Sequence, residues 1–157
     1  MEEQHVQAGQ GQQRHLEAEA TVKGFSYVKP SGVGTAKGFV RLGTSPLLKS
    51  VVQVIKKSGG ENNLHYHKSV DTFWMVLKGR VRFYGPDDVV LGEYGAFEGT
   101  ITPRFSRYWF ENVGDDEAEL LQVAANAMAN QANGGRTDVS EQKFVVGSAE
   151  MIDATKT

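Results

Sequence analysis

One stretch of sequence decides the fold expected for this chain: GGENNLHYHKSVDTFWMVLKG, residues 59–79. Residues two apart in a β-strand point to the same face, so His65 and His67 are expected side by side on a rigid support. Two imidazoles in that arrangement can chelate one metal ion. The alternative is a pair of surface histidines on an edge strand. The neighbouring residues help to distinguish a metal-binding pair from a surface pair.

The order of residues in this stretch resembles the first motif of the cupin family, in which a glycine, a His-x-His pair, a glutamate and a second glycine follow one another. Gly59, His65, His67 and Gly79 fall on its positions, and Thr72 stands where the family has glutamate. The resemblance implies an all-β fold, a single-domain antiparallel β-barrel of the double-stranded β-helix or jelly-roll type. It also implies a metal ion inside the barrel.

A second stretch, PRFSRYWFEN at residues 103–112, resembles the end of the second cupin motif. Pro103 and Asn112 match that motif, while Phe105 replaces its central glycine and Tyr108 replaces its histidine. Of the family's metal ligands, two histidines, a glutamate and a third histidine, only the first pair is therefore retained in kind.

The flanking sequence is consistent with a barrel, because short runs of β-branched and aromatic residues alternate with Gly, Pro and Asp. Lys78-Gly79 and Gly85–Asp88 are expected to form hairpin turns. We expect a flexible tail at residues 1–20, the barrel at 21–130 and a C-terminal arm or extension at 131–157. The strands expected in the barrel are Gly38–Leu42, Lys49–Lys56, His65–His67, Thr72–Leu77, Arg80–Tyr84, Tyr108–Glu111 and Glu119–Ala124.

Composition narrows the possible partners. The formal net charge is -2, so no basic field exists to hold a nucleic acid or an anionic membrane. There is no cysteine, which excludes disulfides and thiolate metal sites. The polar N-terminus has no signal-peptide core, and no run is long enough to span a membrane, so a cytoplasmic location is expected.

The two departures from the family pattern affect the metal site differently. The hydroxyl of Thr72 is a neutral, weak ligand that cannot replace a carboxylate. The phenol of Tyr108 can lose its proton beside a cation and bind it, or it can remain an ordinary donor to a substrate or water. Asp71 and Glu98 are the nearest carboxylates; Asp71 would face away from Thr72 in a regular strand.

Other residues are candidates for binding a small molecule. Thr72 and Trp74 share one strand face, Phe110 is a plausible pocket wall, and Arg104 lies at the bend before Tyr108, where a guanidinium can bind a carboxylate or phosphate. Both faces of the strand Thr72–Leu77 are apolar, which favours a homodimer because one face has to line the barrel and the other has to be covered.

Three functions remain open. The first is a small-molecule metalloenzyme, an oxygenase, isomerase or lyase. In it His65, His67 and Tyr108 hold a divalent or ferric ion (iron, zinc, manganese or nickel) as a Lewis acid or oxygen-activating centre, and Tyr108 also serves as the catalytic residue that orients or protonates the substrate. The second is a non-catalytic small-ligand-binding cupin that has lost its metal. The third is a metal-independent sugar isomerase or epimerase with a histidine base and a tyrosine acid.

Overall fold

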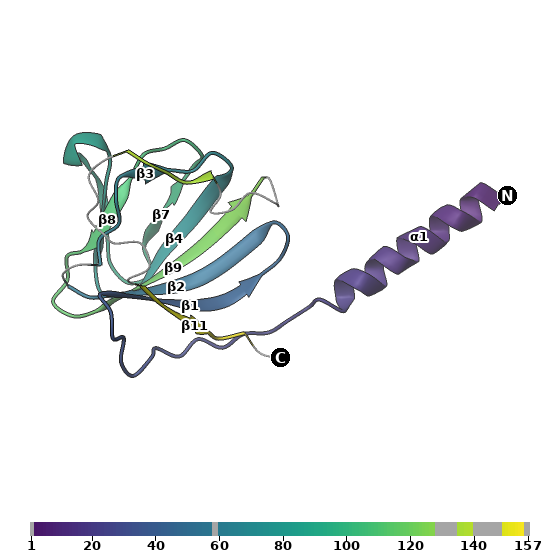
Figure 1. The fold of residues 1–157 in the computed structure, drawn as a ribbon, viewed down its shortest axis with the longest axis horizontal. Helices are drawn as coiled ribbons and strands as arrows, with labels where there is room; N and C mark the ends of the chain where they lie inside the picture. Colours follow the sequence, from purple (N-terminus) through teal and green to yellow (C-terminus); the bar gives the residue numbers. More distant parts are fainter. Residues whose placement is uncertain (1, 58–59, 128–134, 140–148, 156–157) are drawn as a thin grey trace.

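The computed structural model describes residues 2–57, 60–127, 135–139 and 149–155 (Figure 1). Gly59, the first glycine of the histidine motif, lies outside these residues. The chain forms a β-barrel with one N-terminal helix, α1 (Glu2–Glu19), that projects away from it (Figure 1). None of the helices in the described ranges is both long and apolar enough to cross a membrane.

The barrel is built from three sheets. The largest has the strand order β11-β1-β2-β9-β4-β7, a second has the order β6-β5-β8, and a two-stranded ladder joins β10 to β3. The strands are β1 (Lys37–Thr44), β2 (Leu48–Ile55), β3 (His65–Tyr66), β4 (Val70–Lys78), β5 (Val81–Tyr84), β6 (Val90–Tyr94), β7 (Gly99–Thr102), β8 (Trp109–Asn112), β9 (Ala118–Asn126), β10 (Thr137–Asp138) and β11 (Ala149–Asp153).

The alternation of residues along β4 determines which of its side chains face the barrel interior. Its inward side chains Thr72, Trp74 and Val76 are 1%, 2% and 0% exposed, as the alternation predicts. They pack with aromatic residues of the facing sheet, and Trp74 makes edge contacts with Phe83 and Phe110 at ring-centroid distances of 5.7 and 5.1 Å. The other face of β4 points out of the barrel, where Phe73 is 45% exposed.

A second apolar cluster lies on the outer side of the large sheet. Val40 and Leu42 of β1 and Val52 of β2 are buried there beneath Val33 and Tyr27, which come from the segment between α1 and β1. The same segment forms an isolated antiparallel bridge between Phe25 and Thr155. The segment that leads into β1 is therefore held against the segment that follows β11, the last strand.

The two expected turns are present. Gly79 has φ +86, and a Cβ there would lie 3.1 Å from Cα of Ala118, so both conformation and space require glycine. The second turn forms a short 3-10 helix, η1 (Pro86–Asp88), and the carboxylate of Asp88 accepts a hydrogen bond of 2.9 Å from Nε1 of Trp109.

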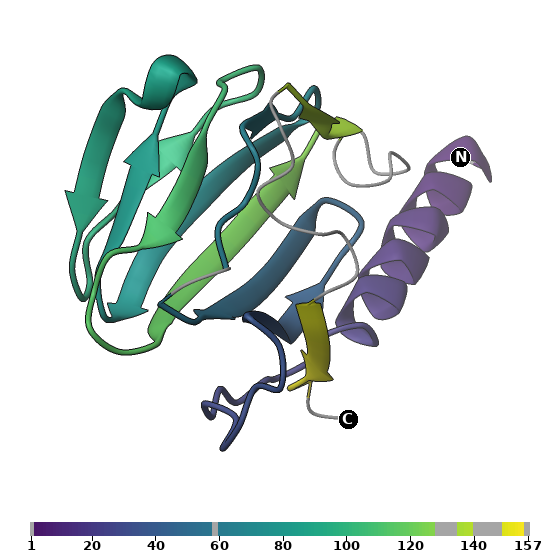
Figure 2. The same ribbon diagram turned by 60° about the vertical axis from the view of Figure 1, so that its left-hand side comes forward.

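Both ends of the chain contain regular secondary structure. The segment expected as a flexible tail is helical over Glu2–Glu19, because Glu, Gln and Ala are good helix formers and Gln13 donates to Glu17 one turn later at 2.8 Å. From the C-terminal arm, β10 pairs with β3 and β11 pairs in parallel with β1 (Figure 2). The arm thus adds strands to two sheets.

Strands β6 and β7 were not among the expected ones. Each is an edge strand in its sheet, and each is short and contains a glycine, at Gly92 and Gly99. Short edge strands with glycine carry a weak alternation signal, which explains why the pattern missed them.

Candidate ligand-binding cavity

The two motif segments meet in space through their main chains. The N–H of His65 donates to the carbonyl of Tyr108 at 3.1 Å, and the N–H of Tyr108 donates back to the carbonyl of His65 at 3.0 Å. One step further along, the N–H of Phe105 donates to the carbonyl of His67 at 2.8 Å. These bonds fix the histidine pair against the second motif.

His65 is held as a neutral imidazole. Its ring lies 5.1 Å from that of His67, centroid to centroid, and its Nδ1 lies 2.6 Å from the carbonyl oxygen of Asn63. Because a carbonyl can only accept, Nδ1 carries the proton and Nε2 keeps its lone pair. Burial, followed by the charge of Arg136, lowers the pKa of His65 to about 3.

Tyr108 brings a buried hydroxyl to the same place. Its ring is 4.5 Å from that of His65, and its Oη has no hydrogen-bond partner of ordinary geometry within the described ranges. Burial raises the pKa of Tyr108 to about 12, although the nearby hydroxyls of Thr102 and Thr72 oppose that rise. Nε1 of Trp74 donates a hydrogen bond of 2.9 Å to the hydroxyl of Thr102. The phenol of Tyr108 is therefore protonated near pH 7 and lies beside the hydroxyls of Thr72 and Thr102.

These groups line a cavity of about 820 Å³ inside the barrel. The lining runs from buried His65 and Phe110 to exposed Pro46 and Leu47 at the β1–β2 turn, so the cavity reaches the surface at that end. Its polar wall includes Gln53, Asn62, Asn63, Gln122 and Asn126. A volume of this size accommodates a small organic molecule.

The charges on the wall are mostly positive. Lys37, Lys49 and Arg136 line the cavity, and among its described residues the carboxylate is that of Asp138, which pairs with Arg136 at 2.9 Å. Lys37 is 2% exposed, and its Nζ lies 4.9 Å from the ring centroid of Phe110. Burial, reinforced by Arg136, lowers the pKa of Lys37 to about 7.

The structure gathers most of the predicted site residues. His65, His67, Trp74, Tyr108 and Phe110 all line the cavity. Thr72 is buried on the same face of β4 as Trp74, with its hydroxyl close to that of Tyr108.

Three predicted candidates lie elsewhere. Arg104 is exposed and outside the cavity, because its backbone N–H and guanidinium face Asp71 at 2.8 and 3.7 Å. Asp71 accordingly points out of the barrel, as its position beside Thr72 requires. The carboxylate of Glu98 accepts from the backbone of Gly95 at 2.8 Å and stabilises a turn.

Lys37 and Arg136 are two of the cavity residues that the sequence pattern does not indicate. Lys37 begins β1, one residue before the strand start expected at Gly38, and shares the inward alternation of Phe39. A strand that begins at Lys37 places its side chain on the same face as Phe39, which is the signal that identifies Lys37 as a cavity residue. Arg136 enters through β10, a two-residue strand with no sequence signal of its own.

The cavity offers only part of the donor set that the metal implied by the resemblance requires. His65 and His67 supply imidazole nitrogens, but within the described residues no group of three or more His, Cys, Asp or Glu comes together. Thr72 offers no charge, and the phenol of Tyr108 is harder to ionise than usual because it is buried. The described residues therefore do not fit the carboxylate-containing centre of the family pattern.

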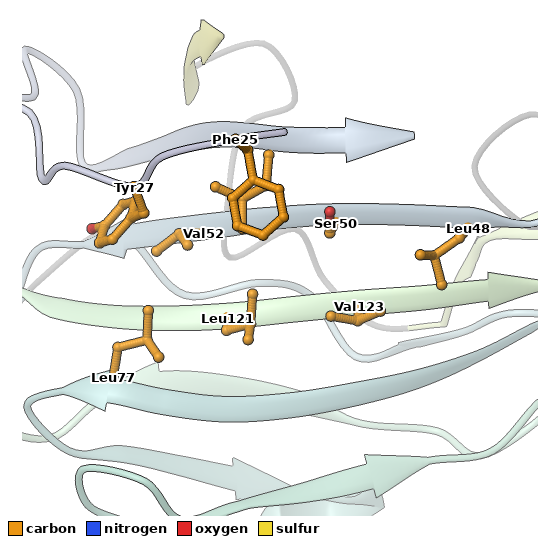
Figure 3. A pocket seen from close by; sticks show the side chains of 9 residues that line it. Phe25, Tyr27, Leu48, Ser50, Val52, Leu77, Leu121 and Val123 are labelled. Atoms are coloured by element: carbon orange, nitrogen blue, oxygen red, sulfur yellow. The ribbon is translucent and has the colours of Figure 1, made fainter. Parts of the chain in front are cut away.

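A second hollow of about 340 Å³ lies on the outer face of the large sheet (Figure 3). Phe25 and Tyr27 come from the segment before β1 and lie over β2, beside Leu121 and Val123 of β9 (Figure 3). Its lining is almost wholly apolar, and none of the described residues in it is acidic, basic or a histidine.

Comparison with known proteins bears on the fold. No family model matches the chain, and no curated protein matches it. Among solved structures, the cupin domain of Cnp3 from Schizosaccharomyces pombe is 19% identical with a TM-score of 0.55, covering 64% of this chain and 73% of that one. A double-stranded β-helix protein from Klebsiella pneumoniae is 20% identical with a TM-score of 0.55, covering 73% and 92%.

An oxalate oxidase in complex with the substrate analogue glycolate is also similar, at 18% identity and a TM-score of 0.53, covering 72% of this chain and 60% of that one. The common feature of these neighbours is the barrel, and at such identities the likeness concerns the fold. The chain has the cupin fold, a double-stranded β-helix, as the two motif segments indicated.

Proposed function

We propose that this protein binds a small carboxylate-bearing organic molecule inside the barrel, as a ligand-binding cupin without a resident metal. The observation that carries the proposal is the charge of the cavity wall, where the basic side chains of Lys49, Arg136 and, in its protonated form, Lys37 face the single carboxylate, Asp138, among the described lining residues. A cavity with low-dielectric walls and one dominant sign of charge concentrates ligands of the opposite sign.

The buried hydroxyl of Tyr108 supports the same proposal. An unsatisfied buried polar group costs on the order of 1–3 kcal/mol, so such a group calls for a partner. A ligand oxygen in the cavity would accept from Tyr108, while Nε2 of His65 would accept from a ligand hydroxyl. The site is thus built for a molecule that carries both a carboxylate and a hydroxyl or carbonyl oxygen.

Acid–base catalysis by His65 and Tyr108 is less well supported. General acid–base groups work best when their pKa lies near the operating pH. The pKa values of about 3 for His65 and about 12 for Tyr108 leave both groups neutral near pH 7. The pair is therefore suited to hydrogen bonding more than to the proton transfers of an isomerase or epimerase.

The metalloenzyme remains the second candidate. The observation that favours it is the orientation of His65, whose Nδ1 is fixed by a backbone carbonyl, since metal-binding histidines commonly use one nitrogen in this way. That function needs at least one further donor beyond the two imidazoles. Elemental analysis of the purified protein, together with metal titration, separates the two candidates.

The proposal is tested by calorimetric titration with glycolate, oxalate and succinate, with uncharged glycolamide for comparison. We expect the carboxylates to bind and glycolamide to bind at least about tenfold more weakly, and Arg136→Gln to weaken carboxylate binding by a similar factor. Arg104→Gln is the matched control, because Arg104 lies outside the cavity. Equal binding of glycolamide, or equal losses in the two arginine variants, would refute the proposal.

A further inference from the structure

Lys37 occupies an unusual place for a lysine. It lies in β1, where its backbone pairs with Ile55 of β2 on one side and with Ala149 of β11 on the other. Its side chain is 2% exposed and forms part of the cavity wall. Lysine is rarely this buried, because taking an ammonium group out of water is costly.

The surroundings of the amine are mixed. Nζ lies above the ring of Phe110, at 4.9 Å from its centroid, which favours the protonated form. Arg136 across the cavity disfavours it, and Glu61 favours it. The other titratable groups on the wall are His65, His67, Tyr108, Lys49 and Asp138.

Burial dominates among these effects and lowers the pKa of Lys37 to about 7. A substantial fraction of the amine is then unprotonated at neutral pH, whereas a solvent-exposed lysine with a pKa of about 10.4 is almost entirely protonated. An unprotonated amine in a water-poor cavity is a nucleophile for carbonyl carbon.

We propose that Lys37 is a covalent binding site for small aldehydes and 2-oxo acids that enter the barrel cavity. Nζ adds to the carbonyl carbon, the resulting carbinolamine loses the former carbonyl oxygen as water, and an imine joins the ligand to Lys37. No oxidant or reductant is needed, and hydrolysis reverses the reaction. Preference for a carbonyl compound that also carries a carboxylate rests on the proposed function, since Arg136 would hold that carboxylate.

The test uses the full chain and two probes of similar size. Glyoxylate carries an aldehyde and a carboxylate, and glycolaldehyde carries an aldehyde and a hydroxymethyl group. Each is added at pH 7 with cyanoborohydride, which reduces the imine to a stable secondary amine, and the modified lysines are located by peptide mass mapping. Lys37→Arg and Lys49→Arg are compared with the parent chain; Lys49 lies on the same wall but is exposed.

We expect Lys37 to be modified at least about tenfold faster than any other lysine, because its amine is far less protonated at this pH. Labelling at this site should disappear in Lys37→Arg and persist in Lys49→Arg. Modification spread over exposed lysines with Lys37 unlabelled would overturn the proposal, and this outcome is read on the parent chain whether or not the variants fold. Equal labelling of Lys37 by both probes would support the imine and would count against the preference for carboxylates.

Discussion

The imidazole of His65 and the phenol of Tyr108 lie 4.5 Å apart, centroid to centroid, and their backbones exchange two hydrogen bonds. Their main chains are therefore held together, although the two residues are far apart in sequence. Nε2 of His65, a neutral acceptor, and the hydroxyl of Tyr108, a neutral donor, therefore lie side by side in the cavity.

Tyr108→Phe should stabilise the protein by about 1 kcal/mol in the absence of ligand, because it removes a buried hydroxyl with no partner of ordinary geometry in the described chain. The same change should weaken binding of glycolate. Stability is measured by urea unfolding and binding by calorimetry.

The matched control is Tyr84→Phe. The hydroxyl of Tyr84 donates to Glu111 at 2.6 Å and accepts from Arg82 at 3.3 Å, so its loss should destabilise by about 1 kcal/mol. A destabilised Tyr108→Phe would show that its hydroxyl has a partner in solution.

Lys37 should make stability rise with pH between about 7 and about 10.4. Its pKa is lowered to about 7 in the folded chain, so above that pH the unfolded chain binds more protons than the folded one. The burial penalty is complete below pH 7 and is relieved as the pH rises. The slope contributed by one such group is at most about 1.4 kcal/mol per pH unit.

This slope is measured by urea unfolding at several pH values, with Lys37→Met for comparison. The variant should lose the rise and should be more stable than the parent at pH 6. An identical slope in both proteins would mean that Lys37 titrates at the ordinary value.

Thr72→Glu should create the metal site that the parent sequence only partly retains. Thr72 is buried on the inward face of β4 near Tyr108, so a carboxylate there would add an anionic oxygen to the two imidazoles. We expect zinc or manganese to bind at least about tenfold more tightly than to the parent, as measured by calorimetry. His65→Ala in the same background should abolish that gain.

Asp71→Asn serves as the control for this change. Asp71 points out of the barrel toward Arg104, so its loss should leave metal binding unaltered. If the parent itself holds stoichiometric metal by elemental analysis, and His65→Ala and His67→Ala each remove it, the metalloenzyme replaces the ligand-binding cupin as the better candidate.

Phe73→Asp should convert a dimer to a monomer. Phe73 is 45% exposed on the outer face of the large sheet, paired with Ile101 of β7 on one side and Val123 of β9 on the other. An apolar row of this kind is best buried against a second copy. Light scattering at micromolar concentration should give a dimer mass for the parent and a monomer mass for the variant.

Deleting Met1–Gln13 should leave the melting temperature nearly unchanged. Helix α1 projects away from the barrel (Figure 1), and the described side chains in this segment, Gly9–Gln13, are largely exposed. A loss of several degrees would show that the helix packs on the barrel or on a partner chain.

The sequence predicted what depends on local pattern. Alternation along β4 predicted that Thr72 and Trp74 face inward, and the motif spacing predicted that His65 and Tyr108 belong to one barrel. Both predictions rest on regular strand geometry and on turns such as that at Gly79.

The remaining features depend on contacts that no local pattern encodes. Arg136 reaches the cavity because a two-residue strand near the C-terminus pairs with β3. Arg104 points outward because the carboxylate of Asp71 accepts from its backbone. Direction at a bend is set by such individual hydrogen bonds, which is why Arg104 was placed wrongly in the pocket.

The bridge between Phe25 and Thr155 has a consequence for how the chain can be rearranged. Because these two residues are paired, the segment before β1 and the segment after β11 lie next to each other. A short peptide could join them, and new termini could then be opened at the exposed Asp87-Asp88 turn without unpairing any strand of the large sheet. The order in which the strands are synthesised is thus separable from the architecture that they form.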